Sequence, residues 1–222
     1  RKREDLAETI RKAFYIAKTG KPGVVVVDLP KDVQKAYGSD SYQKEIAVRG
    51  YKPNTSVHMG QLNKALDILS HAKKPVFLIG GGVNIAHANK EMTQLAEMTG
   101  VPVITTIMGK GAIPTTNDLY VGNISIHGSY AANSAISKCD VLFSIGTRFN
   151  DRITGKIEEF AADAKIIHID IDTASISRNI IVDVPIVADA KKAICALLEK
   201  VKPLHISEWT DEINRLKMEY PI

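Results

Sequence analysis

An apolar run that ends in three glycines occurs at residues 76–82, Val76-Phe77-Leu78-Ile79-Gly80-Gly81-Gly82. Four consecutive apolar residues without polar alternation are typical of a strand that is buried on both faces of a parallel sheet. Glycines directly after such a strand let backbone N–H groups approach a phosphate, because no Cβ stands in the way. The triple glycine is not a G-x-G-x-x-G pattern, so it fits a plain tight turn equally well.

Strands of this kind alternate with helical patterns along the chain. Further strands are predicted at 101–106, 141–145, 165–170 and 184–187, and helices at 59–69, 86–99, 129–137, 156–162 and 189–201. Parallel strands need crossover connections, and helices are the usual ones. The alternation therefore predicts an α/β fold: a doubly wound, Rossmann-like parallel sheet of about six strands with helices on both faces.

The chain also carries a run of four valines near its start, Val24-Val25-Val26-Val27, after a helical pattern that begins at Leu6 and ends before Gly20. The valines predict a strand buried on both faces of a parallel sheet. One helix and one strand cannot enclose a core. We therefore expect these residues to be the closing piece of a neighbouring domain.

Four segments follow from these patterns. They are a closing piece of a neighbouring domain at 1–35, a polar linker at 36–57, a complete domain at 58–202, and at 203–222 a linker that leads to a further domain. The last segment places Trp209 and Ile213 on a predicted helix. The 222 residues thus represent one domain with parts of its neighbours.

Composition excludes several classes of protein. The net charge is +4, and basic and acidic residues are interleaved, which argues against a nucleic-acid surface. No run approaches the roughly 18 apolar residues of a membrane span. Only two cysteines occur, Cys139 and Cys195, which excludes a disulfide scaffold or a zinc finger. We expect a cytoplasmic protein with no membrane or nucleic-acid partner.

Polar and glycine clusters follow nearly every predicted strand, where parallel sheets bind ligands. The most informative is Gly146-Thr147-Arg148-Phe149-Asn150-Asp151-Arg152, because guanidinium groups bind phosphates or carboxylates with two hydrogen bonds each. Other clusters are Thr105 to Gly111 and Gly122 to Gly128, and the latter includes His127. His127 alone is more often a structural hydrogen-bonding group than a base.

A further cluster, His168-Ile169-Asp170-Ile171-Asp172, follows a predicted strand. Its spacing resembles a metal site, but an acid at a strand end more often accepts hydrogen bonds from the ribose of a nucleotide, and Asp189 could act in the same way. No metal is expected. The clusters together predict a dinucleotide site. Motifs for a nucleophile elbow, a P-loop or a zinc protease are absent from the sequence.

Several motifs closely resemble the catalytic large subunit of acetolactate synthase (acetohydroxyacid synthase). The similar stretches are residues 20–34, 73–82, 106–111, 146–156 and 165–172. The resemblance implies that the sheet is the central, FAD-binding domain of a thiamine-diphosphate enzyme. That family decarboxylates pyruvate and joins the two-carbon unit to pyruvate or 2-oxobutanoate in valine, leucine and isoleucine synthesis, with thiamine diphosphate and Mg²⁺.

The resemblance also implies a set of cofactor-binding residues. The residues carried over are Arg49, Gly80, Gly81, Gly82, Thr106, Ile107, Ile124, Ser125, Ile126, His127, Gly146, Thr147, Arg148, Phe149, Asn150, Asp170, Ile171, Asp189 and Ala190. Asp151, Arg152 and His127 are candidates for the substrate channel, where Arg152 would meet the carboxylate of the 2-keto acid. Asn150 stands where many relatives have Asp, which keeps hydrogen-bonding capacity and removes a charge.

The family's catalytic Glu and its diphosphate and Mg²⁺ motif have no counterpart in this sequence, so the resemblance implies that the chain alone is inactive. It further implies a homodimer or homotetramer of catalytic subunits and a regulatory small subunit. Two other readings stay open. One is a related thiamine-diphosphate enzyme, such as a pyruvate oxidase or a glyoxylate carboligase. The other is a nucleotide-binding module without catalysis.

Overall fold

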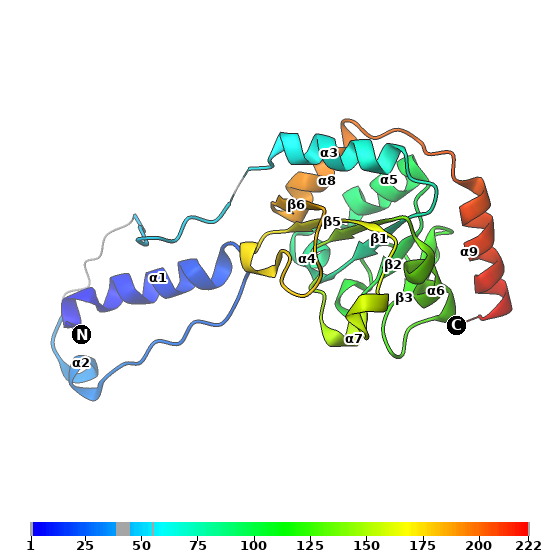
Figure 1. The fold of residues 1–222 in the computed structure, drawn as a ribbon. Helices are drawn as coiled ribbons and strands as arrows, with labels where there is room; N and C mark the ends of the chain where they lie inside the picture. Colours follow the sequence, from blue (N-terminus) through cyan, green and yellow to red (C-terminus); the bar gives the residue numbers. More distant parts are fainter. Residues whose placement is uncertain (1, 39–44, 55, 222) are drawn as a thin grey trace. The chain divides into compact units, whose positions relative to one another are not determined.

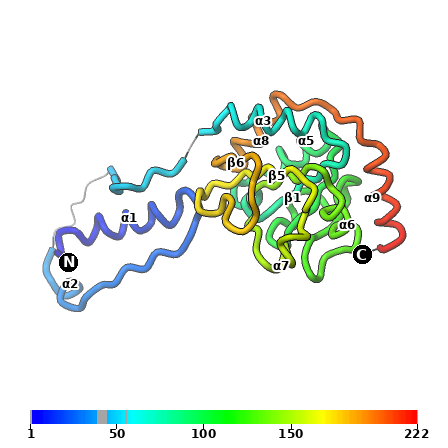
Figure 2. Tube along the Cα trace, viewed as in Figure 1, coloured from blue at the N-terminus to red at the C-terminus, as the bar shows by residue number. Residues whose placement is uncertain are grey.

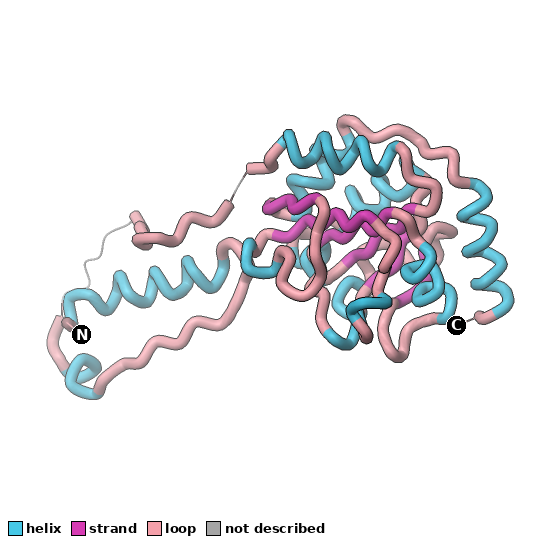
Figure 3. Tube along the Cα trace, in the orientation of Figure 1, coloured by secondary structure: helices cyan, strands magenta, loops and turns pink. Residues whose placement is uncertain are grey.

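The computed structural model describes residues 2–38, 45–54 and 56–221. The chain divides into two compact units, residues 1–54 and residues 55–222. All strands of the described residues belong to the second unit, as Figure 3 shows. Each unit is described separately below.

The second unit contains a six-stranded, all-parallel sheet with the strand order β3-β2-β1-β4-β5-β6 (Figure 1). The strands are β1 (Pro75–Ile79), β2 (Val103–Thr105), β3 (Tyr120–Asn123), β4 (Val141–Ile145), β5 (Lys165–Asp170) and β6 (Val184–Val187). The chain adds strands on one side of β1 as far as β3 and then crosses back to continue on the other side with β4. The predicted doubly wound α/β fold is confirmed.

The centre of the sheet is formed by β1 and β4, in which every residue is buried. The two strands pair in register, Phe77 opposite Phe143, and the rings of these two residues pack edge to face at 5.5 Å. Continuous apolar sequences produce this arrangement because both faces of the central strands are covered by helices. The core therefore lies on both sides of β1 and β4.

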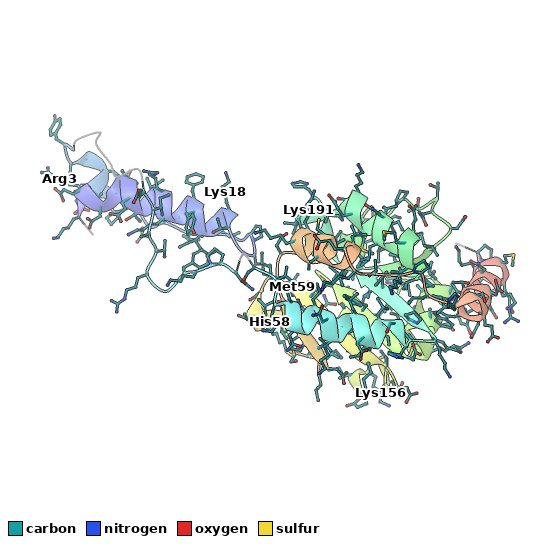
Figure 4. The ribbon with its side chains drawn as sticks, turned by 90° about the horizontal axis from the view of Figure 1, so that it is seen from above. Arg3, Lys18, His58, Met59, Lys156 and Lys191 are labelled. Carbon is teal, nitrogen blue, oxygen red and sulfur yellow. The ribbon has the colours of Figure 1, made fainter. Side chains whose placement is uncertain are left out.

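The helices cover both faces of the sheet, α3, α5 and α8 packing together on one and α6 with α9 on the other (Figure 1). Their bounds are α3 (Met59–Ser70), α4 (Gly81–Ile85), α5 (Asn89–Thr99), α6 (Tyr130–Lys138), α7 (Asp151–Thr154), α8 (Ala190–Leu198) and α9 (Ser207–Glu219). Side chains cap several of them. His58, labelled in Figure 4, accepts from the Gln61 N–H at the start of α3. None of the described helices is long and apolar enough to cross a membrane.

Two expectations for this unit are wrong. The helix predicted at 156–162 is only a 3₁₀ turn, η3 (Ile157–Glu159). Ala161 adopts a left-handed backbone with φ of 46°, and the Phe160 ring is buried against Phe149 at 5.9 Å, so packing ends the helix early. The sequence predicted a loop at the triple glycine, either a phosphate-binding loop or a plain tight turn, before a helix at 86–99; helix α4 instead begins within the triple glycine, although glycine has poor helix propensity.

The first unit contains the helices α1 (Leu6–Lys18) and α2 (Lys31–Lys35), and α1 follows a 3₁₀ turn at Arg3–Asp5. The strand predicted at 24–27 is wrong for this chain. These residues are extended but unpaired within the described part of the chain, and Val24 and Val26 are 95% and 85% exposed. A strand forms only when neighbouring backbone pairs with it, and this unit supplies no neighbour among its described residues.

Tyr51 contacts the C-terminal part of α1 within this unit. The Tyr15 and Tyr51 rings meet edge to face at 5.8 Å, and the Tyr51 hydroxyl donates to the Thr19 carbonyl at 2.8 Å. No described residue of this unit is buried. Residues 39–44 and 55 of the predicted linker lie outside the described residues. The assignment of 1–35 and 36–57 to a neighbouring domain and a linker stays a prediction.

Helix α9 occupies most of the segment expected to lead away from the domain, and it packs into the second unit. Trp209 is 2% exposed, and its Nε1–H donates to the Pro75 carbonyl at 3.0 Å. Glu212 pairs with Lys138 at 2.9 Å and with Lys74 at 3.1 Å. The path of the chain from α8 to α9 can be followed in Figure 2. A connection from 203–222 to a further domain stays a prediction.

Truncation of Trp209 tests whether α9 belongs to the folded core. We expect Trp209→Ala to lower the free energy of unfolding by about 3–5 kcal/mol, because a buried indole leaves a cavity and an unsatisfied carbonyl. Met218→Ala, on the exposed side of the same helix, should change it by less than about 0.5 kcal/mol. Urea unfolding measures both. Equal effects of the two substitutions would contradict the packing of α9.

Candidate functional site

The loops that follow β1 and β4 touch each other at the middle of the sheet. The Gly80 N–H donates to the Ile145 carbonyl and the Gly82 N–H to the Gly146 carbonyl, both at 2.9 Å. A Cβ added at Gly80 would lie 2.2 Å from the Gly146 oxygen, and one added at Gly82 would lie 2.7 Å from the Gly146 Cα. Glycine is needed at 80 and 82 because two backbones meet there.

At this meeting point the strand order changes direction: β2 and β3 extend the sheet on one side of β1, and β4, β5 and β6 extend it on the other. Ligands of open parallel sheets bind at such switch points, beyond the carboxyl ends of the strands. Gly146 itself has φ of 61°, in the left-handed region, and its N–H donates to the Ile169 carbonyl at 2.8 Å. The loop after β4 is therefore joined by backbone hydrogen bonds to the loop after β1 and to the carboxyl end of β5.

Beyond β2, a 3₁₀ turn, η2 (Ile107–Gly109), forms a wall beside the triple glycine. The Thr106 hydroxyl caps this turn by accepting from the Gly109 N–H at 3.1 Å. The side chains of Ile107 and Met108 are each 71% exposed. A Cβ at Gly81 would lie 3.0 Å from the Met108 Cβ, so Met108 borders the glycine loop directly. Ile107 is among the site residues predicted from the sequence and Met108 is not, although both lie in the same hydroxyl- and glycine-rich run.

The loop after β3 presents Ile126 and His127 to solvent, and Ile126 is 75% exposed. Ile124 is buried, and Ser125 is held by Asn133 of α6, whose amide donates to the Ser125 carbonyl at 3.1 Å. The Ser125 hydroxyl in turn accepts from the His127 N–H at 3.1 Å. The exposed apolar side chains of this loop and of η2 follow neighbouring strands of the same edge.

The loop after β4 separates into buried and exposed side chains. Thr147 and Phe149 are buried, and the Phe149 ring packs on His168 at 5.0 Å. The exposed side chains are those of Arg148, Asn150, Asp151 and Arg152. Two cations and one carboxylate thus lie exposed beyond the carboxyl end of β4, beside the switch point. Such a group can bind phosphate or carboxylate oxygens.

His168 lies completely buried beneath this loop. Its Nε2–H donates to the Thr147 carbonyl at 2.9 Å, and its Nδ1 has no hydrogen-bond partner among the described residues. Burial lowers the pKa of His168 below its ordinary value, against the opposing effects of Asp170 and the Thr147 carbonyl. The lowered pKa favours a neutral imidazole beneath the loop. The residues that the structure describes contain no cluster of three potential metal ligands.

The carboxylates after β5 and β6 each have a structural partner. Asp170 Oδ1 accepts from the Asp172 N–H at 2.8 Å, and Asp189 Oδ1 caps α8 by accepting from the Lys192 N–H at 3.1 Å. Ile171 is half-buried and Ala190 is buried beside them. A carboxylate can accept several hydrogen bonds, so these structural partners do not exclude a further bond from a ribose hydroxyl. The predicted roles of these residues stay predictions.

Nearly all of the predicted site residues thus lie along one edge of the sheet. Two hollows among the described residues lie elsewhere and are not lined by the predicted site residues. One, of about 500 Å³, lies beside Lys90 and Lys110, and the other, of about 350 Å³, lies between α9 and the amino end of β3. The candidate site is therefore an open edge. Arg49 is exposed in the first unit, and its predicted contact with a cofactor stays a prediction.

The family model described as "Thiamine pyrophosphate enzyme, central domain" matches residues 62–197. This chain belongs to that family. The matched residues run from within α3 to within α8 and include all six strands of the sheet. The resemblance inferred from the sequence is thereby confirmed at the level of the family.

Three similar proteins are the probable acetolactate synthase large subunit of Methanocaldococcus jannaschii, the acetolactate synthase large subunit of Corynebacterium glutamicum and the acetolactate synthase of Mycobacterium bovis. They are 46%, 43% and 40% identical and align with 98%, 98% and 99% of this chain. The chain spans 38%, 36% and 36% of their respective lengths.

The buried imidazole of His168 makes stability depend on pH. Its pKa is lowered in the folded state, so its contribution is complete above the unfolded value of about 6.5 and is lost as pH falls below that value. We expect His168→Gln to reduce the loss of unfolding free energy between about pH 7.5 and pH 5.5. The exposed His205→Gln serves as the control. A wild-type pH dependence in His168→Gln would contradict this account.

Proposed function

We propose that this chain is the FAD-binding central region of the large subunit of an acetolactate synthase. Membership of the thiamine pyrophosphate enzyme family and the names of the similar proteins support the enzyme class. The observation that carries the FAD assignment is the glycine contact between the loops after β1 and β4, which leaves bare backbone at the switch point of the sheet.

The residues of this edge fit a flavin dinucleotide in three respects. Glycine backbone at 80–82 and 146 keeps Cβ atoms away from a pyrophosphate, and Arg148 supplies a positive charge directly after β4. Ile107, Met108 and Ile126 expose apolar surface, which suits an aromatic ring system.

The adenosine end of the dinucleotide would lie on the β5 and β6 side of the switch point. Asp170 and Asp189 supply the hydrogen-bond acceptors for ribose hydroxyls there, while Ile171 and Ala190 line the same part of the edge. The pyrophosphate would lie between, over the glycine loops and Thr106. The flavin ring would extend towards the loops after β2 and β3, against Ser125, His127 and the apolar side chains of those loops.

In the whole enzyme, thiamine diphosphate held with Mg²⁺ supplies the carbanion chemistry that joins pyruvate to pyruvate or 2-oxobutanoate. Asp151 and Arg152 lie exposed at the start of α7, where the Arg152 guanidinium can bind the carboxylate of a 2-keto acid. FAD takes no net redox part in this reaction. We further propose a homodimer or homotetramer with a regulatory small subunit as the assembly.

Flavin binding by the purified chain tests the proposal. We expect the chain to bind added FAD, measured by the quenching of flavin fluorescence, and Arg148→Ala to raise the Kd at least tenfold by removing a charge-assisted hydrogen bond of about 1.5–3 kcal/mol. Arg215→Ala, an exposed arginine on α9, should bind FAD like the wild type. The same preparation should form no acetolactate from pyruvate.

Two results would contradict the proposal. A wild-type chain that binds no FAD would exclude the flavin site, and an unchanged Kd in Arg148→Ala would remove the charged residue from it. Acetolactate formation by the chain alone would refute the statement that it lacks the catalytic machinery. Peroxide or tartronate semialdehyde formation, in place of acetolactate, by the full-length protein would indicate a pyruvate oxidase or a glyoxylate carboligase.

A further inference from the structure

Two asparagine side chains fasten the loop after β2 to the helices after β1. The Asn84 amide, in α4, donates from Nδ2 to the Met108 carbonyl at 2.9 Å and to the Lys110 carbonyl at 3.2 Å. The Asn89 amide, at the start of α5, donates to the Gly111 carbonyl at 2.8 Å and to Asn84 Oδ1 at 2.7 Å. We call this pair with its four hydrogen bonds the asparagine clamp.

The clamp uses the full donor capacity of both amides. Each Nδ2 has two hydrogens, and each of the four donates to a different oxygen. An aspartate of the same shape has no donor and would bring negative oxygens towards carbonyl oxygens. The arrangement therefore requires an amide at both positions. A carboxylate would turn the attraction between donor and carbonyl oxygen into a repulsion between two oxygens.

The clamped loop is the part of the edge that carries the exposed apolar wall. On its inner side Gly109 lies against β1, where an added Cβ would be 2.1 Å from the Ile79 carbonyl. On its outer side the side chains of Ile107 and Met108 are exposed, and Met108 lies next to Gly81. The backbone that carries these two side chains is thus fixed from one side by β1 and from the other by the clamp.

We propose that Asn84 and Asn89 are positioning residues of the flavin site. They touch no cofactor themselves. They hold residues 106–111 so that Ile107 and Met108 form a rigid apolar surface at the correct distance from the glycine loop. This inference rests on the proposed function, because it concerns the geometry of the same site. Rigid support of contact residues is a general requirement for tight binding.

Asn84→Asp tests the clamp, and Asn63→Asp is a matched control with the same change of charge. Asn63 lies exposed on α3 and accepts from Lys200 at 3.1 Å through its Oδ1, an interaction that aspartate keeps. Two quantities are measured on the 222-residue chain: amide hydrogen exchange of residues 106–111 without cofactor, and the Kd and visible absorption spectrum of added FAD.

We expect Asn84→Asp to speed exchange in residues 106–111 about tenfold or more, to raise the Kd for FAD at least tenfold, and to alter the visible flavin band at saturating FAD. Asn63→Asp should match the wild type in all three. Asn89→Asp, which leaves the bonds from Asn84 to Met108 and Lys110 in place, should give smaller effects in the same direction and replaces Asn84→Asp if that variant does not fold.

The outcomes separate this inference from the proposed function. Unchanged exchange in both variants would overturn the clamp. Faster exchange with an unchanged Kd and spectrum would overturn the positioning role while leaving the flavin site intact. A wild-type chain that binds no FAD would overturn the proposed function, and with it the role towards the cofactor.

Discussion

Two backbone loops, after β1 and β4, meet with no room for a side chain between them. This contact joins the strands at which the sheet changes direction, and it aligns the end of β1 with the end of β4. The glycines at 80, 82 and 146 are therefore structural requirements of the fold. The same bare backbone is what a pyrophosphate needs, so one local constraint serves the sheet and the site together.

Around this contact the edge of the sheet is supported from behind. The neutral His168 holds the β4 loop through the Thr147 carbonyl, and the asparagine clamp holds the β2 loop from α4 and α5. Side chains that point outward from these loops, such as Arg148 and Met108, are thereby presented on fixed backbone. An open edge with exposed apolar and cationic groups suits the flavin dinucleotide that we propose.

The sequence predicted five of the six strands because these are apolar runs bounded by turns, but it did not predict β3 (Tyr120–Asn123), which is short and contains Gly122 and Asn123. The predicted bounds 141–145, 165–170 and 184–187 are those of β4, β5 and β6. It failed where distant contacts decide. The valines at 24–27 have no strand to pair with among the residues that the structure describes, and Phe160 packs on Phe149 instead of continuing the helix expected at 156–162. The clamp could not be foreseen either, since Asn84 and Asn89 meet their carbonyl partners only in the folded chain.

The glycine contact is tested most directly by the free energy of unfolding of Gly82→Ala compared with Gly60→Ala. Both residues lie in helices, where alanine is otherwise favoured by up to about 1 kcal/mol. At Gly60 an added Cβ meets only the ring of the exposed His58 at 3.0 Å, whereas at Gly82 it meets the Gly146 backbone. We predict a loss of about 2 kcal/mol or more for Gly82→Ala and little change for Gly60→Ala. Equal stability of the two variants would contradict the account.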